Sequence, residues 1–125
     1  MNLKNRPVRV IITGAAKQEF ESLRRIVGEE ISKGVKKSEH QILLRSINNK
    51  IELLKVNPQH GIHIQKNKIP RKYIEMYEVN NLWKINLSGA WRLIYTVKGT
   101  KIEILTVILD LMNHKNYSKK FGYKN

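Results

Sequence analysis

Two basic side chains occur inside segments that otherwise have the composition of buried β-strands. Lys84 lies within LWKINL, and Arg92 lies within WRLIYTV. Arginine binds phosphate through paired, planar hydrogen bonds, whereas lysine binds it as a point charge. The segment after the last apolar run adds His114 and Tyr117, whose side chains can both carry a proton. These residue types together favour a site that binds a phosphate group and transfers protons beside it.

The alternation of side chains along the strands predicts where the two cations point. Because successive residues of a strand face opposite sides, the segments 82–87 and 91–97 each have one largely apolar side. We expect this side to pack against helices. We expect Lys84, Asn86 and Arg92 to gather on the opposite, open face of the sheet.

Two other interpretations of these cations remain open at this point. They are solvated charges on the wet face of an ordinary antiparallel sheet, or Arg92 is the partner of a carboxylate such as Glu103 on the neighbouring strand. Two like charges that lie close across a hairpin destabilise it, however, unless an anion joins them. Lys84 and Arg92 therefore favour an anion-binding site.

The net charge of the chain supports the same interpretation. Twenty-four Lys and Arg residues against ten Asp and Glu residues give a formal charge of +14. Such an excess most often accompanies a polyanionic partner, with a solvated basic surface as the alternative. The lysines are scattered along the chain and do not line one amphipathic helix, which disfavours binding to a membrane surface.

Several chemistries are disfavoured by what the sequence lacks. Without cysteine there is no disulfide, thiolate metal site or thiol nucleophile. Asp110 is the only aspartate, which argues against a two-metal nuclease, and His60 and His63 have no evident third metal ligand. We therefore expect no cofactor and no metal. No apolar run reaches the ~20 residues of a membrane span, and no signal peptide is evident, so we expect a cytoplasmic protein.

The first half of the chain predicts one strand and two helices. VRVII (8–12) is typical of a strand, and 28–34 reads as a polar connection between the helices. Ser38 and Gln41 have the spacing of a capping box at the start of the second helix, and Asn57 with the following proline ends it. The first helix is predicted from apolar residues at helical spacing, namely Ala16, Phe20, Leu23 and Val27.

The second half predicts a β-meander after a long basic loop at 59–73. Segment 73–79 reads as an irregular edge strand. Three strong strand candidates follow, namely 82–87, 91–97 and 101–109, and they are joined by the turns SGA and KGT, each with a glycine for positive φ. We thus expect a single α+β domain (1–125). Two N-terminal helices would pack on a mostly antiparallel four-stranded sheet in the order β-α-α-β-β-β.

These features resemble the RelE/ParE superfamily of type II toxins from prokaryotic toxin–antitoxin pairs. Beyond the order of elements, LWKINLSGAWRLIYTV is similar to the family's YKIKL…YRLVY hairpin, and HKNYSKKFGY matches its terminal His-x-x-Tyr. The resemblance covers nearly the whole chain. It implies an mRNA endoribonuclease that cuts on the ribosome without a metal, by attack of the ribose 2′-hydroxyl, and that an antitoxin holds inactive.

The resemblance also implies roles for single residues. Arg92 would stabilise charge on the phosphate, and Lys84 would bind the phosphate or activate the 2′-hydroxyl. His114 and Tyr117 would transfer protons or stack on the substrate base. Residues that would contact RNA are Lys68, Arg71, Lys72, Asn86, Lys115, Lys119 and Lys120. In two places the chain departs from the family: Asn86 stands where studied endonucleases carry a second lysine, and the usual arginine near the terminal motif is not evident.

The same resemblance leaves two other functions open. One is a ParE-like inhibitor of DNA gyrase, and the other is a catalytically degenerate, basic module that binds RNA or a partner. The expected partners are a cognate antitoxin with an acidic segment, mRNA and the ribosome, and no membrane. A homodimer is one form open to the protein in the absence of antitoxin.

Overall fold

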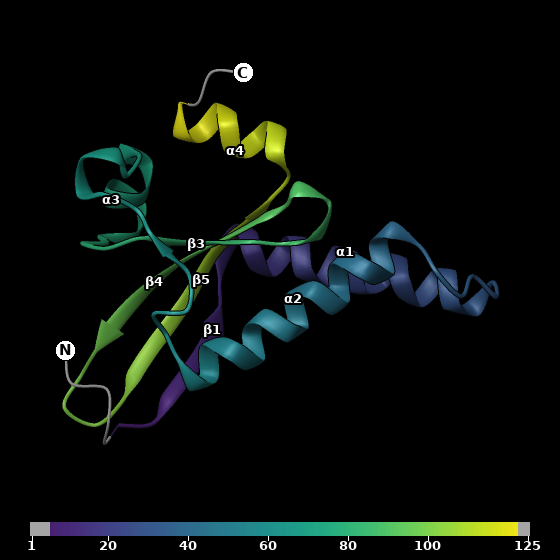
Figure 1. The fold of residues 1–125 in the computed structure, drawn as a ribbon, viewed down its shortest axis with the longest axis horizontal. Helices are drawn as coiled ribbons and strands as arrows, with labels where there is room; N and C mark the ends of the chain where they lie inside the picture. Colours follow the sequence, from purple (N-terminus) through teal and green to yellow (C-terminus); the bar gives the residue numbers. More distant parts are fainter. Residues whose placement is uncertain (1–5, 123–125) are drawn as a thin grey trace.

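A computed structural model describes residues 6–122 as an α+β fold (Figure 1). Its five strands are β1 (Val8–Ile12), β2 (Ile62–His63), β3 (Trp83–Asn86), β4 (Arg92–Gly99) and β5 (Ile104–Met112). Its α-helices are α1 (Gly14–Ser32), α2 (Glu39–Val56), α3 (Arg71–Tyr77) and α4 (His114–Phe121). The strands form one mixed sheet in the order β1-β5-β4-β3-β2, in which only the β1–β5 pair is parallel. The predicted fold class is therefore confirmed at this level, with five strands in place of the expected four.

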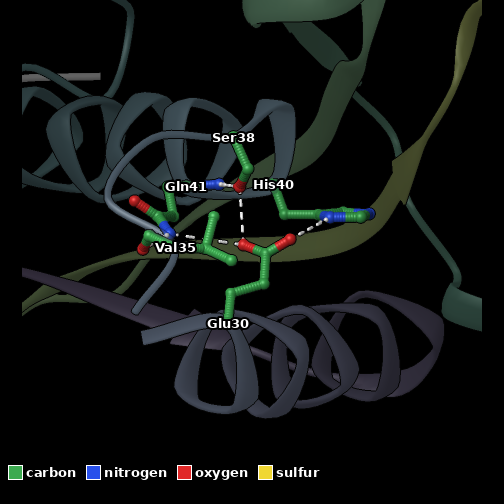
Figure 2. Close-up of polar contacts among 5 residues, drawn as sticks. All are labelled: Glu30, Val35, Ser38, His40 and Gln41. Atoms are coloured by element: carbon green, nitrogen blue, oxygen red, sulfur yellow. Dashed lines mark hydrogen bonds and ion pairs between the residues drawn. The ribbon is translucent and has the colours of Figure 1, made fainter. Parts of the chain in front are cut away.

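Helices α1 and α2 form a hairpin whose bend is held by a polar cluster. Ser38 is the N-cap of α2 and accepts a hydrogen bond from the Gln41 amide at 3.1 Å, as the capping-box spacing predicts. The Gln41 side chain does not complete the box, because it donates to the carbonyl of Val35 at 2.9 Å. Figure 2 shows the Glu30 carboxylate between Ser38 (2.5 Å) and His40 (2.9 Å). These two hydrogen bonds, the first above all, lower the pKa of Glu30 below its ordinary 4.5.

The expected polar connection at 28–34 is wrong at its start. Helix α1 continues through Gly28 to Ser32, and only Gly34 adopts the positive φ of a turn, at 82°. An exposed glycine inside a helix costs about 1 kcal/mol relative to alanine, which the packing of the rest of α1 outweighs. The end of α2 at Val56, just before Asn57, is as predicted.

The first hydrophobic core lies between the α1–α2 hairpin and one face of the sheet. Ile47 and Leu54 of α2 are almost completely buried there against Leu93 and Ile108 of the central strands. The sides of 82–87 and 91–97 that the sequence predicts to be apolar belong to this core, namely Trp83, Ile85, Leu87, Trp91, Leu93, Tyr95 and Val97. The alternation argument is thus confirmed for both strands.

The segment between α2 and β3 differs from prediction. Residues 73–79 are not an edge strand, because Arg71–Tyr77 form α3, which ends at Glu78 with a left-handed φ of 52°. Within the predicted loop 59–73, Ile62–His63 pair with Lys84 and Trp83 and supply the fifth strand. Of the two predicted turns, the first is as expected, because Gly89 has a positive φ of 64°. The second differs from the prediction, because Gly99 belongs to β4.

The face of the sheet that was expected to be open is covered. Helices α3 and α4 lie together over the end of the sheet where β3 runs, apart from the α1–α2 hairpin (Figure 1). Beneath them is a second core of buried residues, namely Ile64, Ile69, Tyr73, Val79, Leu82, Ile94, Leu109, Met112 and Tyr117. The two helices also touch each other, with the rings of Tyr73 and Phe121 5.8 Å apart. The sheet is therefore sandwiched between two unequal helical layers.

Candidate functional site

The β3–β4 hairpin and α4 meet at one end of the sheet. Asn86 lies opposite Arg92 in the β3–β4 ladder, and Arg92 lies opposite Met112 in the β4–β5 ladder. Helix α4 begins two residues after Met112, with Asn113 as its N-cap accepting a hydrogen bond from the Asn116 amide at 2.9 Å. The predicted strand cations and the predicted terminal motif are thereby brought to the same place.

The aromatic ring of Tyr117 is the point on which the two cations converge. The Lys84 Nζ lies 5.2 Å from the ring centroid, and the Arg92 Cζ lies 5.4 Å from it. Both distances are in the range of cation–π attraction, which is stronger where water is excluded, and Tyr117 is only 2% exposed. Three of the four predicted catalytic residues, Lys84, Arg92 and Tyr117, therefore form one cluster, in which both cations lie against the tyrosine ring.

The guanidinium of Arg92 is incompletely satisfied by the described residues. One of its terminal nitrogens donates to the carbonyl of Trp91 at 3.2 Å, but its buried Nε has no hydrogen-bond partner between residues 6 and 122. The alternative partner, Glu103, is 2.9 Å from Arg9 instead. A buried N–H without an acceptor costs roughly 1–3 kcal/mol, so the contacts among the described residues leave this nitrogen unsatisfied.

The two predicted proton carriers occupy different environments. His114 is exposed at the first position of α4, with its Nε2 3.4 Å from the hydroxyl of Ser118. Tyr117 is buried beneath the cations. Asn86 is exposed at the end of β3. Of the two proton carriers, His114 is the one exposed to solvent.

The predicted RNA-contacting cations fall into two groups. Exposed side chains with no ion pair in the described part of the chain are Lys68, Lys72, Lys115 and Lys119. Arg71 instead pairs with Glu75 at 3.8 Å on α3, and Lys120 pairs with Asp110 at 3.4 Å. The first group lies on or just before the helices α3 and α4, the layer that also contains Tyr117.

Sequence reasoning missed two buried polar residues beside this cluster, Tyr73 and Asp110. Burial, followed by the hydrogen bond to Asp110, raises the pKa of the Tyr73 hydroxyl far above its usual range. One signal in the sequence points to such a pair. Asp110 interrupts the apolar run ILTVILDLM, and a carboxylate in a buried strand requires partners.

Three further findings concern metal ligands, membrane-spanning helices and similarity to known proteins. Within residues 6–122, no three His, Asp or Glu side chains come together as a metal site requires, so His60 and His63 acquire no third ligand. None of the helices over the same range combines the length and apolar character needed to cross a bilayer. The chain matches no known family model, no curated protein and no solved structure.

Proposed function

We propose that this protein is a RelE-like toxin of a type II toxin–antitoxin pair, a cytoplasmic endoribonuclease that cleaves mRNA on the ribosome. The observation that carries the proposal is the convergence of Lys84 and Arg92 on the ring of Tyr117, next to His114 at the start of α4. The resemblance of the β3–β4 hairpin and of the terminal His-x-x-Tyr to the RelE/ParE superfamily supports it. So does the formal charge of +14, which suits a polyanionic substrate.

The proposed chemistry needs no co-reactant beyond the RNA. The ribose 2′-oxygen forms a bond to the adjacent phosphorus while its proton passes to a base, and the bond from phosphorus to the 5′-oxygen breaks. The leaving oxygen takes up a proton, which gives a 2′,3′-cyclic phosphate and a 5′-hydroxyl. Negative charge grows on the non-bridging oxygens in the transition state, and Arg92 and Lys84 are the groups that stabilise it.

We assign the solvent-accessible proton transfer to His114. Its imidazole is exposed, and histidine exchanges protons readily near neutral pH. Tyr117 serves in this proposal to orient both cations, because its ring is buried and lies against the two of them. The remaining proton transfer then falls to Lys84, whose amine lies 5.2 Å from the centroid of the Tyr117 ring.

A second candidate function rests on the burial of Tyr117 and on the neutral Asn86. If neither residue supplies charge or a proton, the cluster binds a phosphodiester without cutting it. The protein would then be a basic module that binds RNA or an acidic antitoxin segment. The two functions differ in turnover and share the same binding residues.

The experiment that separates them supplies the purified protein with ribosomes and mRNA and determines the chemical ends of any fragments. The endoribonuclease yields 2′,3′-cyclic phosphate ends, and Arg92→Ala abolishes them. Arg25→Ala, a change of equal charge on the exposed surface of α1, leaves them intact. Fragments that persist in Arg92→Ala contradict the site assignment, and salt-sensitive binding without fragments favours the second candidate.

A further inference from the structure

The sheet contains one register shift, and it determines where the only aspartate points. In the β4–β5 ladder Ile94 lies opposite Asp110, but the next residue, Tyr95, lies opposite Ile108. Leu109 is therefore an extra residue, as in a β-bulge, and bulges commonly redirect a side chain. As a result Leu109 belongs to the second core, and its neighbour Asp110 faces the same α3–α4 layer.

Asp110 joins both helices of that layer to the sheet. The hydroxyl of Tyr73 on α3 donates to its Oδ2 at 2.5 Å, and the Lys120 Nζ of α4 lies 3.4 Å from the same oxygen. The ammonium of Lys120 is also 5.2 Å from the centroid of the Tyr73 ring. The carboxylate is only 8% exposed, so this is a largely desolvated pair whose disruption leaves an uncompensated charge.

The same contacts continue to the candidate site through stacked rings. Tyr73 lies 5.8 Å from Phe121, and Phe121 stacks on Tyr117 at 4.5 Å. Helix α3 has seven residues and α4 has eight, and helices this short are not stable without tertiary contacts. The position of the Tyr117 ring therefore depends on what holds α4 to the sheet.

We propose that Asp110 is a positioning residue, which binds Tyr73 and Lys120 and so holds α4 where Tyr117 contacts its two cations. The inference rests on the proposed function, since it concerns the geometry of that same site. It extends the site to a buried residue of β5 that acts through Tyr73 and Lys120.

Net charge and positioning predict opposite results for Asp110→Asn, which makes the variant informative. The change removes a negative charge, so long-range electrostatics alone would tighten binding to RNA. Loss of positioning weakens binding and slows cleavage at saturating RNA, because a misplacement of about 1 Å can cost up to about 100-fold in rate. Asparagine retains an oxygen for the Tyr73 hydroxyl, so the variant mainly loses the ion pair with Lys120.

The experiment compares Asp110→Asn and Lys120→Met with Lys98→Met, a control on the exposed end of β4. It measures the dissociation constant for a short single-stranded oligoribonucleotide, the single-turnover cleavage rate, and amide hydrogen exchange in α2 and α4. We expect both site variants to weaken binding, to lower the single-turnover rate about tenfold or more, and to expose α4 amides while α2 stays protected. The double variant should be no worse than the poorer single variant.

Wild-type affinity together with wild-type protection of α4 in Lys120→Met overturns the inference, even if Asp110→Asn fails to fold. Tighter RNA binding by a folded Asp110→Asn overturns it as well. Failure of the proposed function has a different signature. In that case the wild-type protein binds the oligoribonucleotide no better than Arg92→Ala does, whatever the exchange of α4 shows.

Discussion

The two faces of the sheet pack against different kinds of side chain. Beneath α1 and α2 the core is mostly aliphatic, and the buried hydroxyl of Tyr95 donates to the carbonyl of Pro58 at 2.7 Å and accepts from the amide of Gly61 at 2.9 Å. Burial raises the pKa of this tyrosine to about 12. Beneath α3 and α4 the core contains the buried rings of Tyr73 and Tyr117, with cations against both.

This difference indicates a division between stability and recognition. The long helices α1 and α2 bury continuous apolar stripes, and burial of this kind supplies most of the free energy of folding. The short helices α3 and α4 cover a smaller apolar core, which also contains two buried tyrosine rings, one buried carboxylate and the cations against them. These polar and ring contacts depend strongly on geometry. We therefore expect changes in the first layer to alter the free energy of unfolding, and changes in the second to alter RNA binding.

The largest expected effect is on stability, from Leu54→Ala in the first core. Leu54 is fully buried, and truncation of such a leucine costs about 3 kcal/mol of unfolding free energy. Urea denaturation followed by tryptophan fluorescence measures this loss. The folded protein should keep its affinity for RNA within about twofold, because ~0.5 kcal/mol is the usual limit of coupling between distant sites. A large loss of RNA affinity in Leu54→Ala, measured where the variant is fully folded, would contradict this separation of stability from RNA binding.

A smaller effect is expected at Gly61, where the two regions meet. A Cβ added there would lie 2.7 Å from the carbonyl oxygen of Lys84 and 2.8 Å from the hydroxyl of Tyr95. Gly61→Ala should therefore cost about 1–3 kcal/mol of stability and, by displacing the Lys84 backbone, weaken RNA binding too. Gly28→Ala in α1 is the matched control, since nothing lies within 4 Å of its Cβ. It should stabilise the protein by up to ~1 kcal/mol.

The smallest effect, at the bend of the α1–α2 hairpin, should be present near neutral pH and disappear in acid. The pKa of Glu30 is lowered in the folded protein by Ser38 and then His40. Its contribution to stability is therefore complete above the ordinary value of 4.5 and is lost as the pH falls below it. Thermal unfolding of wild type and Glu30→Gln should differ at pH 6 and converge toward pH 3. A difference that grows with acidity would reverse the sign and contradict the assignment.

The sequence predicted the local features of the fold that depend on neighbouring residues. The alternation of Trp83 and Ile85 against Lys84 identified the face that packs beneath α1 and α2, and Ser38 and Asn57 marked the ends of α2. These predictions succeed because strand faces and helix caps are set by residues a few positions apart.

The features that failed depend on contacts between distant segments. The apolar pattern of segment 73–79 is compatible with the period of a strand and with that of a helix. In the folded protein Tyr73 lies in a helix, where it contacts the distant residues Asp110 and Phe121. The bulge at Leu109 has no sequence signature of its own. The second layer was missed for the same reason, because α4 is polar apart from the rings of Tyr117 and Phe121. The RelE/ParE resemblance and the assigned roles stay predictions.

The central claim is that Arg92, with Lys84, binds a phosphodiester over the ring of Tyr117. The most direct test measures the affinity of wild type, Arg92→Ala and Arg25→Ala for single-stranded RNA over a series of salt concentrations. We predict that Arg92→Ala weakens binding about tenfold and lowers the slope of log affinity against log salt by about 1, whereas Arg25→Ala changes neither appreciably. Equal behaviour of the two variants would contradict the account.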